Sequence, residues 1–551
     1  MGLTQEVTVV SSQVRLVKLR CVKWSRIVVV VVGLLASQAR GPLAHAAAAP
    51  LIVNIDNPNF RKLAVAVPVF HVSGASQADV QQVARDGATE LARLLAFTGM
   101  FSVMSEDAYK EIAAKMHAHP GLNSAQGLEA VEVLQWKGIG VESLTIGDVT
   151  QEADGLTFNL RTVDINKSGL LLGKKYSKVA KGDVIRVMRR YADIVLQAYT
   201  GKPGIFSTML VFVGKQSTRG DKQIYVSDFD GSNARQITRE RVPHLSPSWS
   251  PDGRFITYTS YEDGNPDLFI YDITTGKKRK LSGRRGLNSG SNWSPNGRLV
   301  AFTGSVEGDA DIYVTAPTGG ERKLLIRGQG LDVDPAFSPD GKWLAFVSGR
   351  FGNPHIFRAS LEWRGDADVR VKEDKRLTYA GWYNATPAWS PASDKIVFAG
   401  YDKDIDRFDL FMMNPDGTGM ERLTIRAGDN ESPTWSPNGQ MVIFHSNRIK
   451  GVDKKAQCQI WVMNRDGGGQ RSLTTGLFDA QTPKWGPVLG EMALSQAWQV
   501  LDHLPRQVAE VATPTRAVAG KAKALVPQRV PALKRMAPVA KSGSKVSSGP
   551  G

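Results

Sequence analysis

The sequence predicts a multidomain protein in which a small N-terminal α/β domain precedes an all-β, six-bladed β-propeller. Three observations lead to this prediction. A short aromatic phrase occurs six times between residues 244 and 490. The region before it lacks the phrase and mixes apolar strand-like runs with amphipathic helical stretches. The two ends of the repeat array also complement each other, as a closed ring requires.

The chain opens with the three-part form of a secretory signal. Basic residues end at Arg26, an apolar run occupies residues 27–36, and Ala44-His45-Ala46 fits an A-x-A cleavage site. This run is too short to cross a bilayer, which takes about 20 apolar residues. We therefore expect residues 1–46 to be a signal peptide and the mature protein to be exported. An uncleaved membrane anchor is the alternative, and the long leader leaves the start codon open.

The formal net charge of +16 lies mostly at the two ends of the chain. Residues 1–46 contribute +5 and residues 506–551 contribute +8, which leaves +3 for the body between them. Because the body is nearly neutral, the total charge does not indicate a nucleic-acid partner. The two cysteines are Cys21 and Cys458. Removal of the leader leaves one, so no intramolecular disulfide is expected.

The recurring phrase is centred on an aromatic residue and followed by turn residues. In four copies the aromatic precedes SPDG or SPNG, whereas the fourth copy reads SPASD and the last reads GPVLG. Pro suits the second position of a tight turn, Asp or Asn the third, and Gly closes it. The aromatic residues are Trp249, Trp293, Phe337, Trp389, Trp435 and Trp485.

Each copy carries the pattern of four short strands. The turn joins a first strand to a second, such as FITYTS or WLAFVSG, and a third follows, such as DLFIYD or QIWVMN. A further turn leads to a short fourth strand ending near RQIT, RKLS or ERLT. Four strands in about 45 residues are typical of one propeller blade.

The ends of the array are out of phase. The last phrase, TPKWGP, has no strands after it, and the strands MLVFVGK and KQIYVSD have no phrase before them. Together they complete one blade, so we expect a propeller over residues 205–488. Its strand near Trp485 should lie innermost, beside strands from residues 209–238. A β-sandwich and an open solenoid are the alternatives.

Residues 47–200 are expected to form the α/β domain. Residues 63–70 read as a buried strand, residues 78–99 as an amphipathic helix, and residues 101–105 as a second strand. Three further strands and a closing helix that stops at Gly201 complete it. The tail, residues 505–551, is rich in Ala, Val, Pro, Lys and Ser without periodicity, and we expect it to be disordered.

Motifs for catalysis or cofactor binding are missing from the sequence. It contains no G-x-S-x-G elbow, no H-E-x-x-H pair, no Walker loop and no G-x-G-x-x-G. We therefore expect a protein that is not an enzyme and has no metal and no cofactor; a calcium ion at the channel stays open. The alternative is an exported propeller hydrolase or lyase acting on cell-wall carbohydrate or peptide, which would require paired carboxylates in the channel. A sugar-binding disc is a third option.

One position, five residues before each aromatic, is polar in five of the six copies. In a propeller it would enter the innermost strand and ring one mouth of the channel. Such residues serve either as turn formers or as a docking ring for a protein, rimmed by Asp334, Trp382, Tyr383 and Glu431. A rigid disc with variable loops on one face is typical of a binding platform. The ring positions are His244, Asn288, Asp332, Asn384, Asn430 and, as the apolar exception, Ala480.

These features, in this order, resemble the TolB family of the Gram-negative Tol-Pal system. The resemblance covers about residues 50–488 and rests on the export signal, the segment LIVNIDNPNFRKLAVAVPVF, an α/β domain of this length and the SPDG repeats. It implies a monomeric, non-enzymatic scaffold in the periplasm that supports outer-membrane integrity and constriction during cell division. The long leader and the basic tail depart from the family pattern.

The resemblance also implies partners and the residues that bind them. It implies the lipoprotein Pal on one propeller face, at the ring of His244, Asn288, Asp332, Asn384 and Asn430. It implies TolA at the N-terminus of the mature chain, and other outer-membrane proteins as further partners, but no nucleic acid. The TolA segment would be Leu51, Ile52, Val53, Asn54, Ile55 and Asp56.

Overall fold

The computed structural model describes residues 61–504, apart from residues 74–77, 118–129, 306–307, 405, 426, 451–455, 475–476 and 478. The expected signal peptide, the proposed TolA segment and the basic tail lie outside the described residues. Within the described part of the chain, every helix is too short or too polar to span a bilayer.

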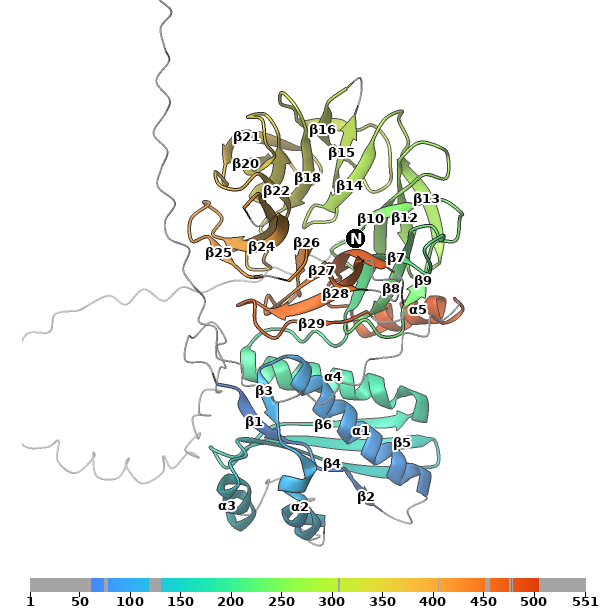
Figure 1. Ribbon diagram of the computed structural model, residues 1–551. Coiled ribbons are helices and arrows are strands. Elements are labelled where there is room, and N and C mark those ends of the chain that lie inside the picture. Colours follow the sequence, from blue (N-terminus) through green and yellow to red (C-terminus); the bar gives the residue numbers. More distant parts are fainter. Residues whose placement is uncertain are drawn as a thin grey trace, which may run out of the picture. The chain divides into compact units, whose positions relative to one another are not determined.

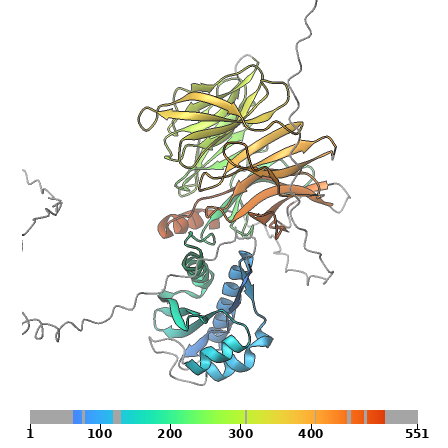
Figure 2. The same ribbon diagram turned by 90° about the vertical axis from the view of Figure 1, so that its left-hand side faces the viewer.

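The N-terminal domain is an α/β domain built on one mixed sheet (Figure 1). The sheet order is β3-β1-β4-β5-β6, and β2 also pairs with β4. Helices α1 and α4 pack on one face of the sheet, and α2 and α3 pack on the other (Figures 1 and 2). The elements are β1 Leu63–Ala66, β2 His71–Ser73, α1 Ala78–Phe97, β3 Phe101–Val103, η1 Glu106–Ala108, α2 Lys110–His117, α3 Ala130–Gly138, β4 Ser143–Glu152, β5 Gly155–Asp164, β6 Gly169–Val179, η3 Lys181–Asp183 and α4 Val184–Thr200.

The sequence explains most of these boundaries. In α1, Val80, Ala84, Leu91 and Leu95 recur at helical spacing and are buried against the sheet. Helix α4 ends at Gly201, which has φ 68° and donates its N–H to Gln197 O at 2.8 Å. The single strand predicted for residues 63–70 is wrong: the chain forms β1 and β2 instead, with Pro68 between them. Proline has no N–H for a strand ladder.

The rest of the described chain is dominated by six four-stranded antiparallel sheets, which confirms the predicted six-bladed β-propeller. Each sheet is one blade, and we number the blades from the one that contains both ends of the array. From the innermost strand outward, blade 1 is β30 (Asp479–Trp485), β7 (Met209–Lys215), β8 (Gln223–Asp228) and β9 (Arg235–Gln236); blade 2 is β10 (His244–Trp249), β11 (Phe255–Ser260), β12 (Asp267–Asp272) and β13 (Lys277–Ser282); blade 3 is β14 (Asn288–Trp293), β15 (Val300–Ser305), β16 (Ala310–Thr315) and β17 (Lys323–Ile326); blade 4 is β18 (Asp332–Phe337), β19 (Trp343–Ser348), β20 (His355–Trp363) and β21 (Val369–Arg376); blade 5 is β22 (Tyr383–Trp389), β23 (Ile396–Asp402), β24 (Arg407–Met413) and β25 (Glu421–Arg422); blade 6 is β26 (Asn430–Trp435), β27 (Met441–Lys450), β28 (Ala456–Asn464) and β29 (Arg471–Ser472).

The innermost strands form a closed ring. Each contacts the innermost strand of the next blade, and β26 of blade 6 contacts β30 of blade 1. Strand β30 pairs antiparallel with β7, with Trp485 opposite Leu210. The Trp485 indole N–H donates to Thr208 Oγ1 at 2.8 Å. The two ends of the array therefore complete blade 1 without a covalent link, as their complementary sequences predict.

Every innermost strand has the same irregularity, three residues before its aromatic. The register shifts there, and the residue takes a positive φ. In blade 3 this residue is Gly290, with φ 62°. A bulge of this kind bends a strand and increases its twist, so all six innermost strands curve alike around the channel. The other five residues are Ser246, Asp334, Thr386, Ser432 and Thr482, with φ between 45° and 53°.

A helix that the sequence analysis did not predict follows blade 1. Helix α5 spans Glu491–Asp502, and its Trp498 and Leu501 pack with Trp249 and Tyr271 in one buried apolar cluster. At the same end of the blades, the β8–β9 turn contacts the N-terminal domain, because Arg189 donates to Asp228 at 2.8 Å. The opposite end of the ring is the one from which the innermost strands start.

Candidate partner-docking face

Strand direction decides which loops share one end of the ring. Because neighbouring strands of a blade are antiparallel, the start of each first strand, the loop from the second to the third strand, and the link from the fourth strand to the next blade meet at one end. We call this end the entry face. Its described loops are residues 216–222, 237–243, 261–266, 283–287, 308–309, 327–331, 349–354, 377–382, 403–404, 406, 423–425, 427–429, 473–474 and 477.

The five polar ring residues gather at the entry face, as their spacing predicts. Their side chains, however, lie beneath its surface, since each of the five residues is 3% exposed or less. Each also makes hydrogen bonds within the propeller. Contact between these side chains and Pal stays a prediction, and their exposed neighbours are the more direct candidates. The five are His244, Asn288, Asp332, Asn384 and Asn430.

Asn288 shows what these positions do for the fold. Its Nδ2 donates to three backbone carbonyls, at Arg284 (2.8 Å), Gly286 (3.1 Å) and Pro266 (3.2 Å). Its Oδ1 accepts from Ser282 Oγ at 2.9 Å. Pro266 and Ser282 belong to blade 2, whereas Asn288 opens blade 3. The side chain therefore joins two blades and adds hydrogen bonds to carbonyls of the loops around it.

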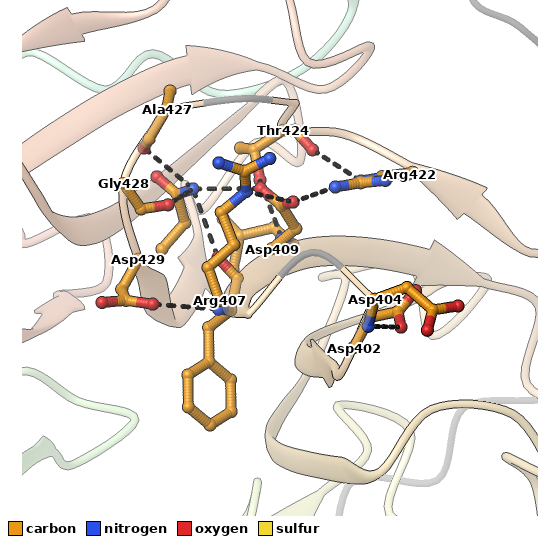
Figure 3. A network of polar contacts seen from close by, with 12 residues as sticks. Asp402, Asp404, Arg407, Asp409, Arg422, Thr424, Ala427, Gly428 and Asp429 are labelled. Carbon is orange, nitrogen blue, oxygen red and sulfur yellow. Dashed lines mark hydrogen bonds and ion pairs between the residues drawn. The ribbon is translucent and has the colours of Figure 1, made fainter.

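Asn430 repeats this arrangement between blades 5 and 6, and Figure 3 shows its partners Gly428 and Asp409. Its Nδ2 donates to Gly428 O at 3.1 Å and to Asp409 Oδ1 at 3.2 Å. Asp409, on β24 of blade 5, also accepts from Thr424 Oγ1 at 2.7 Å and from Arg422. An asparagine amide can donate and accept at once, which suits a position that links two blades.

The other three ring residues also have polar contacts with neighbouring side chains. Asp332 accepts from Arg350 Nη2 at 3.2 Å, and burial raises the pKa of its carboxyl. Asn384 lies with Nδ2 3.0 Å from His355 Nδ1. His244 approaches Glu240 Oε2 at 3.2 Å through Nε2, and burial lowers its pKa to about 4. His244 is therefore neutral at neutral pH.

Exposed apolar side chains mark one sector of the entry face. Of the ten large apolar residues found exposed in the described chain, four lie in its loops: Phe351 (68%), Tyr379 (71%), Trp382 (47%) and Ile425 (58%). All four belong to blades 4 and 5 or to the links that follow them. The Lys403 ammonium lies over the Trp382 ring, and the Arg376 guanidinium lies over the Tyr379 ring. Aromatic and arginine side chains grouped in this way are typical of protein interfaces.

Sequence reasoning identified only Trp382 of these four. The signal for the others was present, because Phe351 lies in GRFGNP and Tyr379 in TYAGWY. Both stretches are glycine-containing loops with no alternating pattern that would bury a side chain. Large apolar residues in such loops are more informative than polar residues next to a strand.

The channel contains a carboxylate and an ammonium on opposite blades. Asp334 on β18 and Lys484 on β30 lie three blades apart in a ring of six. Burial raises the pKa of Asp334, and Lys484 partly counteracts this rise. Burial likewise lowers the pKa of Lys484. A carboxylate opposite an ammonium is a different arrangement from the paired carboxylates that a hydrolase or lyase would require in the channel. Within the described residues, no group of three or more His, Cys, Asp and Glu side chains is arranged to hold a metal ion.

Comparison with known proteins agrees with this architecture. The family model described as the TolB amino-terminal domain matches residues 51–171. The model described as the TolB beta propeller domain matches residues 196–489, more than half of the chain. The chain belongs to the TolB family. Its propeller is thus a TolB-family propeller, as the resemblance implied.

Curated relatives carry the name Tol-Pal system protein TolB. The protein from Desulfosudis oleivorans is 36% identical over 215 residues, which are 39% of this chain and 46% of the relative. That from Hydrogenovibrio crunogenus is 31% identical over 219 residues, or 39% and 47%. The chain thus spans about half the length of the curated relatives it matches. The crystal structure of TolB from Acinetobacter baumannii superposes with a TM-score of 0.63 at 24% identity, over 78% of this chain and 97% of that one, and supports the fold.

Proposed function

We propose that the protein is a periplasmic, non-catalytic scaffold of the Tol-Pal system. It binds Pal on the entry face of the propeller and TolA through residues 51–56. In this way it supports outer-membrane integrity and constriction during cell division. The observation that carries the proposal is the apolar sector of the entry face on a TolB-family propeller.

The aromatic side chains of the apolar sector are exposed, and the loops that carry them are anchored at both ends. Phe351, Tyr379 and Trp382 are held by loops whose ends are fixed in paired strands, so binding orders few residues. Large aromatic side chains that become buried are the usual source of binding energy in protein interfaces. A scaffold requires such a surface but no catalytic group. The channel is consistent with this role, because the two charged groups that face each other there are a carboxylate and an ammonium rather than two carboxylates.

The TolA part of the proposal concerns a segment outside the described residues. The described chain starts at Arg61, whose guanidinium forms two hydrogen bonds with Glu142, at 2.6 and 2.7 Å. Residues 51–56 therefore precede a point that is held to the N-terminal domain, while Pal would bind at the entry face of the propeller. Separate sites would allow one chain to bind both partners.

The test measures both partners on the same variants. In Tyr379→Ala/Trp382→Ala, two exposed aromatic side chains are lost, and we expect Pal affinity to fall at least about ten-fold. TolA binding should stay unchanged. The matched control, Met420→Ala/Val488→Ala, removes two exposed apolar side chains at the other end of the ring and should change neither affinity. An unchanged Pal affinity in the aromatic variant would overturn the docking assignment, and a deletion of residues 51–56 that leaves TolA binding intact would overturn the other.

A further inference from the structure

Because the six blades are similar, a partner on the entry face has several nearly equivalent orientations about the ring axis. The innermost strands share one bulge and one pairing pattern and have six or seven residues each. A partner that read only these shared features would dock in several rotations about the ring axis. The side chains that differ from blade to blade must therefore decide the rotation, and charged loops are the largest such difference on the entry face.

One sector of the entry face carries exposed arginines without counter-ions. They lie in the blade 1 loop 216–222 and in the links 237–243 and 283–287, which lead into blades 2 and 3. All five are exposed, and no described acidic side chain forms an ion pair with any of them. We call them the arginine arc: Arg219, Arg239, Arg241, Arg284 and Arg285.

Four acidic side chains beside the arginine arc form ion pairs with lysines, whereas the exposed Asp221 in loop 216–222 forms none among the described residues. Lys278 Nζ lies 2.6 Å from Glu262 and also pairs with Glu240. Lys280 Nζ lies 2.6 Å from Asp267 and also pairs with Asp263. Both lysines come from β13 of the same blade, and two lysines balance two of these four carboxylates. The five arginines of the arc exceed the two remaining carboxylates and Asp221, so the sector keeps a net positive charge.

The opposite sector carries four carboxylates, of which Asp404 and Asp406 are exposed and Asp402 and Asp429 are half-buried. Asp402 ends β23, and Asp404 and Asp406 follow in the loop to β24. Asp429 lies in the link to blade 6, and Figure 3 shows it with Asp402 and Asp404. Their hydrogen-bond partners are neutral: Tyr401 OH donates to Asp406 at 2.6 Å, and the Asp404 N–H donates to Asp402 at 3.0 Å. Among the described residues, no cation forms an ion pair with these four, which we call the acidic arc. Lys403 lies over the Trp382 ring instead.

The two arcs face each other across the channel. The arginine arc is centred on blade 2 and the acidic arc on blade 5, three blades apart in a ring of six. The exposed Phe351, Tyr379 and Trp382 lie between them on one side. The entry face thus carries an electrostatic dipole across the ring, and an apolar sector that reduces its symmetry further.

We propose that the two arcs fix the rotational register of a single protein partner on the entry face. That partner carries acidic side chains opposite the arginine arc and basic ones opposite the acidic arc. Arginine suits this role because its planar guanidinium binds carboxylates through two parallel hydrogen bonds. The inference rests on the proposed function, since it takes the partner of the entry face to be a protein. An anionic lipid surface fits less well, because it would meet the acidic arc at the same time.

Association kinetics with the soluble domain of Pal from the same organism test the arginine arc. Complementary charge accelerates encounter and makes it salt-dependent. In Arg239→Glu/Arg284→Glu/Arg285→Glu, the association rate constant should fall at least about ten-fold at low salt, and its salt dependence should flatten or reverse. The control Arg298→Glu/Lys342→Glu/Arg370→Glu has the same charge change on exposed residues away from the entry face. It should stay within about two-fold of the unmodified protein.

The register itself is read by site-specific photo-cross-linking from positions 261 and 379, which lie in loops of different blades. In the unmodified protein each position should label one separate patch of Pal. When both arcs are reversed, by adding Asp402→Lys/Asp404→Lys/Asp406→Lys to the arginine variant, the labelled patches should spread or exchange.

The outcomes separate the inference from the proposed function. If the unmodified chain does not bind Pal, both fail. If it binds, and reversal changes neither the association rate nor the cross-linked patches, the arcs do not set the register although the scaffold stands. If reversal of the arginines abolishes binding to phosphatidylglycerol vesicles and leaves Pal binding intact, the arc contacts lipid and the inference is wrong.

Discussion

The guanidinium of Arg448 donates a hydrogen bond from Nη2 to Asn430 Oδ1 at 2.5 Å. The other end of the same amide donates to Asp409 of the preceding blade. Arg448 is itself held over the Trp461 ring and donates to Gln470 at 2.7 Å. Asn430 is therefore the centre of a hydrogen-bond network that connects blade 5 to two strands of blade 6. Its polar side chain stabilises the contact between these blades independently of any partner.

Asn430→Ala should destabilise the propeller without changing its surface. The substitution removes one hydrogen bond from the Asp409 carboxylate and one from the Arg448 guanidinium, and the loss of a hydrogen bond to a charged group costs about 1.5–3 kcal/mol. Urea denaturation measures the loss of unfolding free energy. Asn166→Ala, at an exposed turn, is the matched control and should cost under about 0.5 kcal/mol. Equal costs for the two variants would contradict the assignment of Asn430 as an interblade link.

Trp485→Ala should weaken the closure of the ring. The indole is buried at the junction of β30 and β7, and its N–H has Thr208 as partner. Removal of a buried tryptophan costs about 3–5 kcal/mol. Hydrogen exchange should show faster exchange in β7 than in β14, since β7 pairs with β30 and β14 does not. Val488→Ala, three residues later and exposed, should leave both measurements unchanged.

Local patterns in the sequence were sufficient to predict the blades. In the SPDG turn after Trp249, Asp252 Oδ1 accepts from Ser250 Oγ at 2.5 Å and from the Arg254 N–H at 3.0 Å. These contacts join residues within one short turn, so the residue types alone indicate them. Blade 1 was also predictable. The start of the array lacks an innermost strand, and the end of the array supplies an innermost strand with no outer strands after it.

The burial of the ring residues was not predictable in the same way. Asn430 is the first residue of β26, and from the sequence an asparagine at the start of a strand is predicted to be an exposed turn residue. Its partners Asp409 and Arg448 are 21 and 18 residues away in the sequence. Nothing local distinguishes a polar residue that links two blades from one that faces solvent. Helices α2, α3 and α5 were missed because their apolar stripes are short and lack clear caps.

The free energy of unfolding should fall on acidification, in part through His445. Burial lowers its pKa to about 4 from 6.5, so the unfolded chain binds more protons between these values. Stability from this group is complete above pH 6.5 and is lost as the pH falls toward 4. Lys222 lowers this pKa further, and Asp429 and a backbone hydrogen bond at Glu431 raise it.

His445→Gln isolates this contribution. We expect the decrease in unfolding free energy between pH 6.5 and 4.5 to be smaller in the variant than in the unmodified protein, because one buried proton acceptor is gone. The decrease should not vanish, since His244 and His355 also have pKa values lowered to about 4. His503→Gln, at an exposed position, should keep the full pH dependence. The same slope in His445→Gln as in the unmodified protein would refute the buried neutral form.

Gly204→Ala should destabilise the junction that leads into the propeller. A Cβ at Gly204 would lie 2.0 Å from Asp193 Oδ1 and 2.4 Å from its Cα, so the linker and α4 cannot keep their present distance. Asp193 holds this linker by accepting from the Phe206 N–H at 2.8 Å and from Ser207 Oγ at 2.6 Å. Forced separation would break these bonds as well as the packing, at a cost of at least about 1–3 kcal/mol. Urea denaturation measures the cost, and Gly182→Ala, where a Cβ meets nothing within 4 Å, is the control. If Gly204→Ala proves as stable as Gly182→Ala, the close approach of the linker to α4 does not exist in solution.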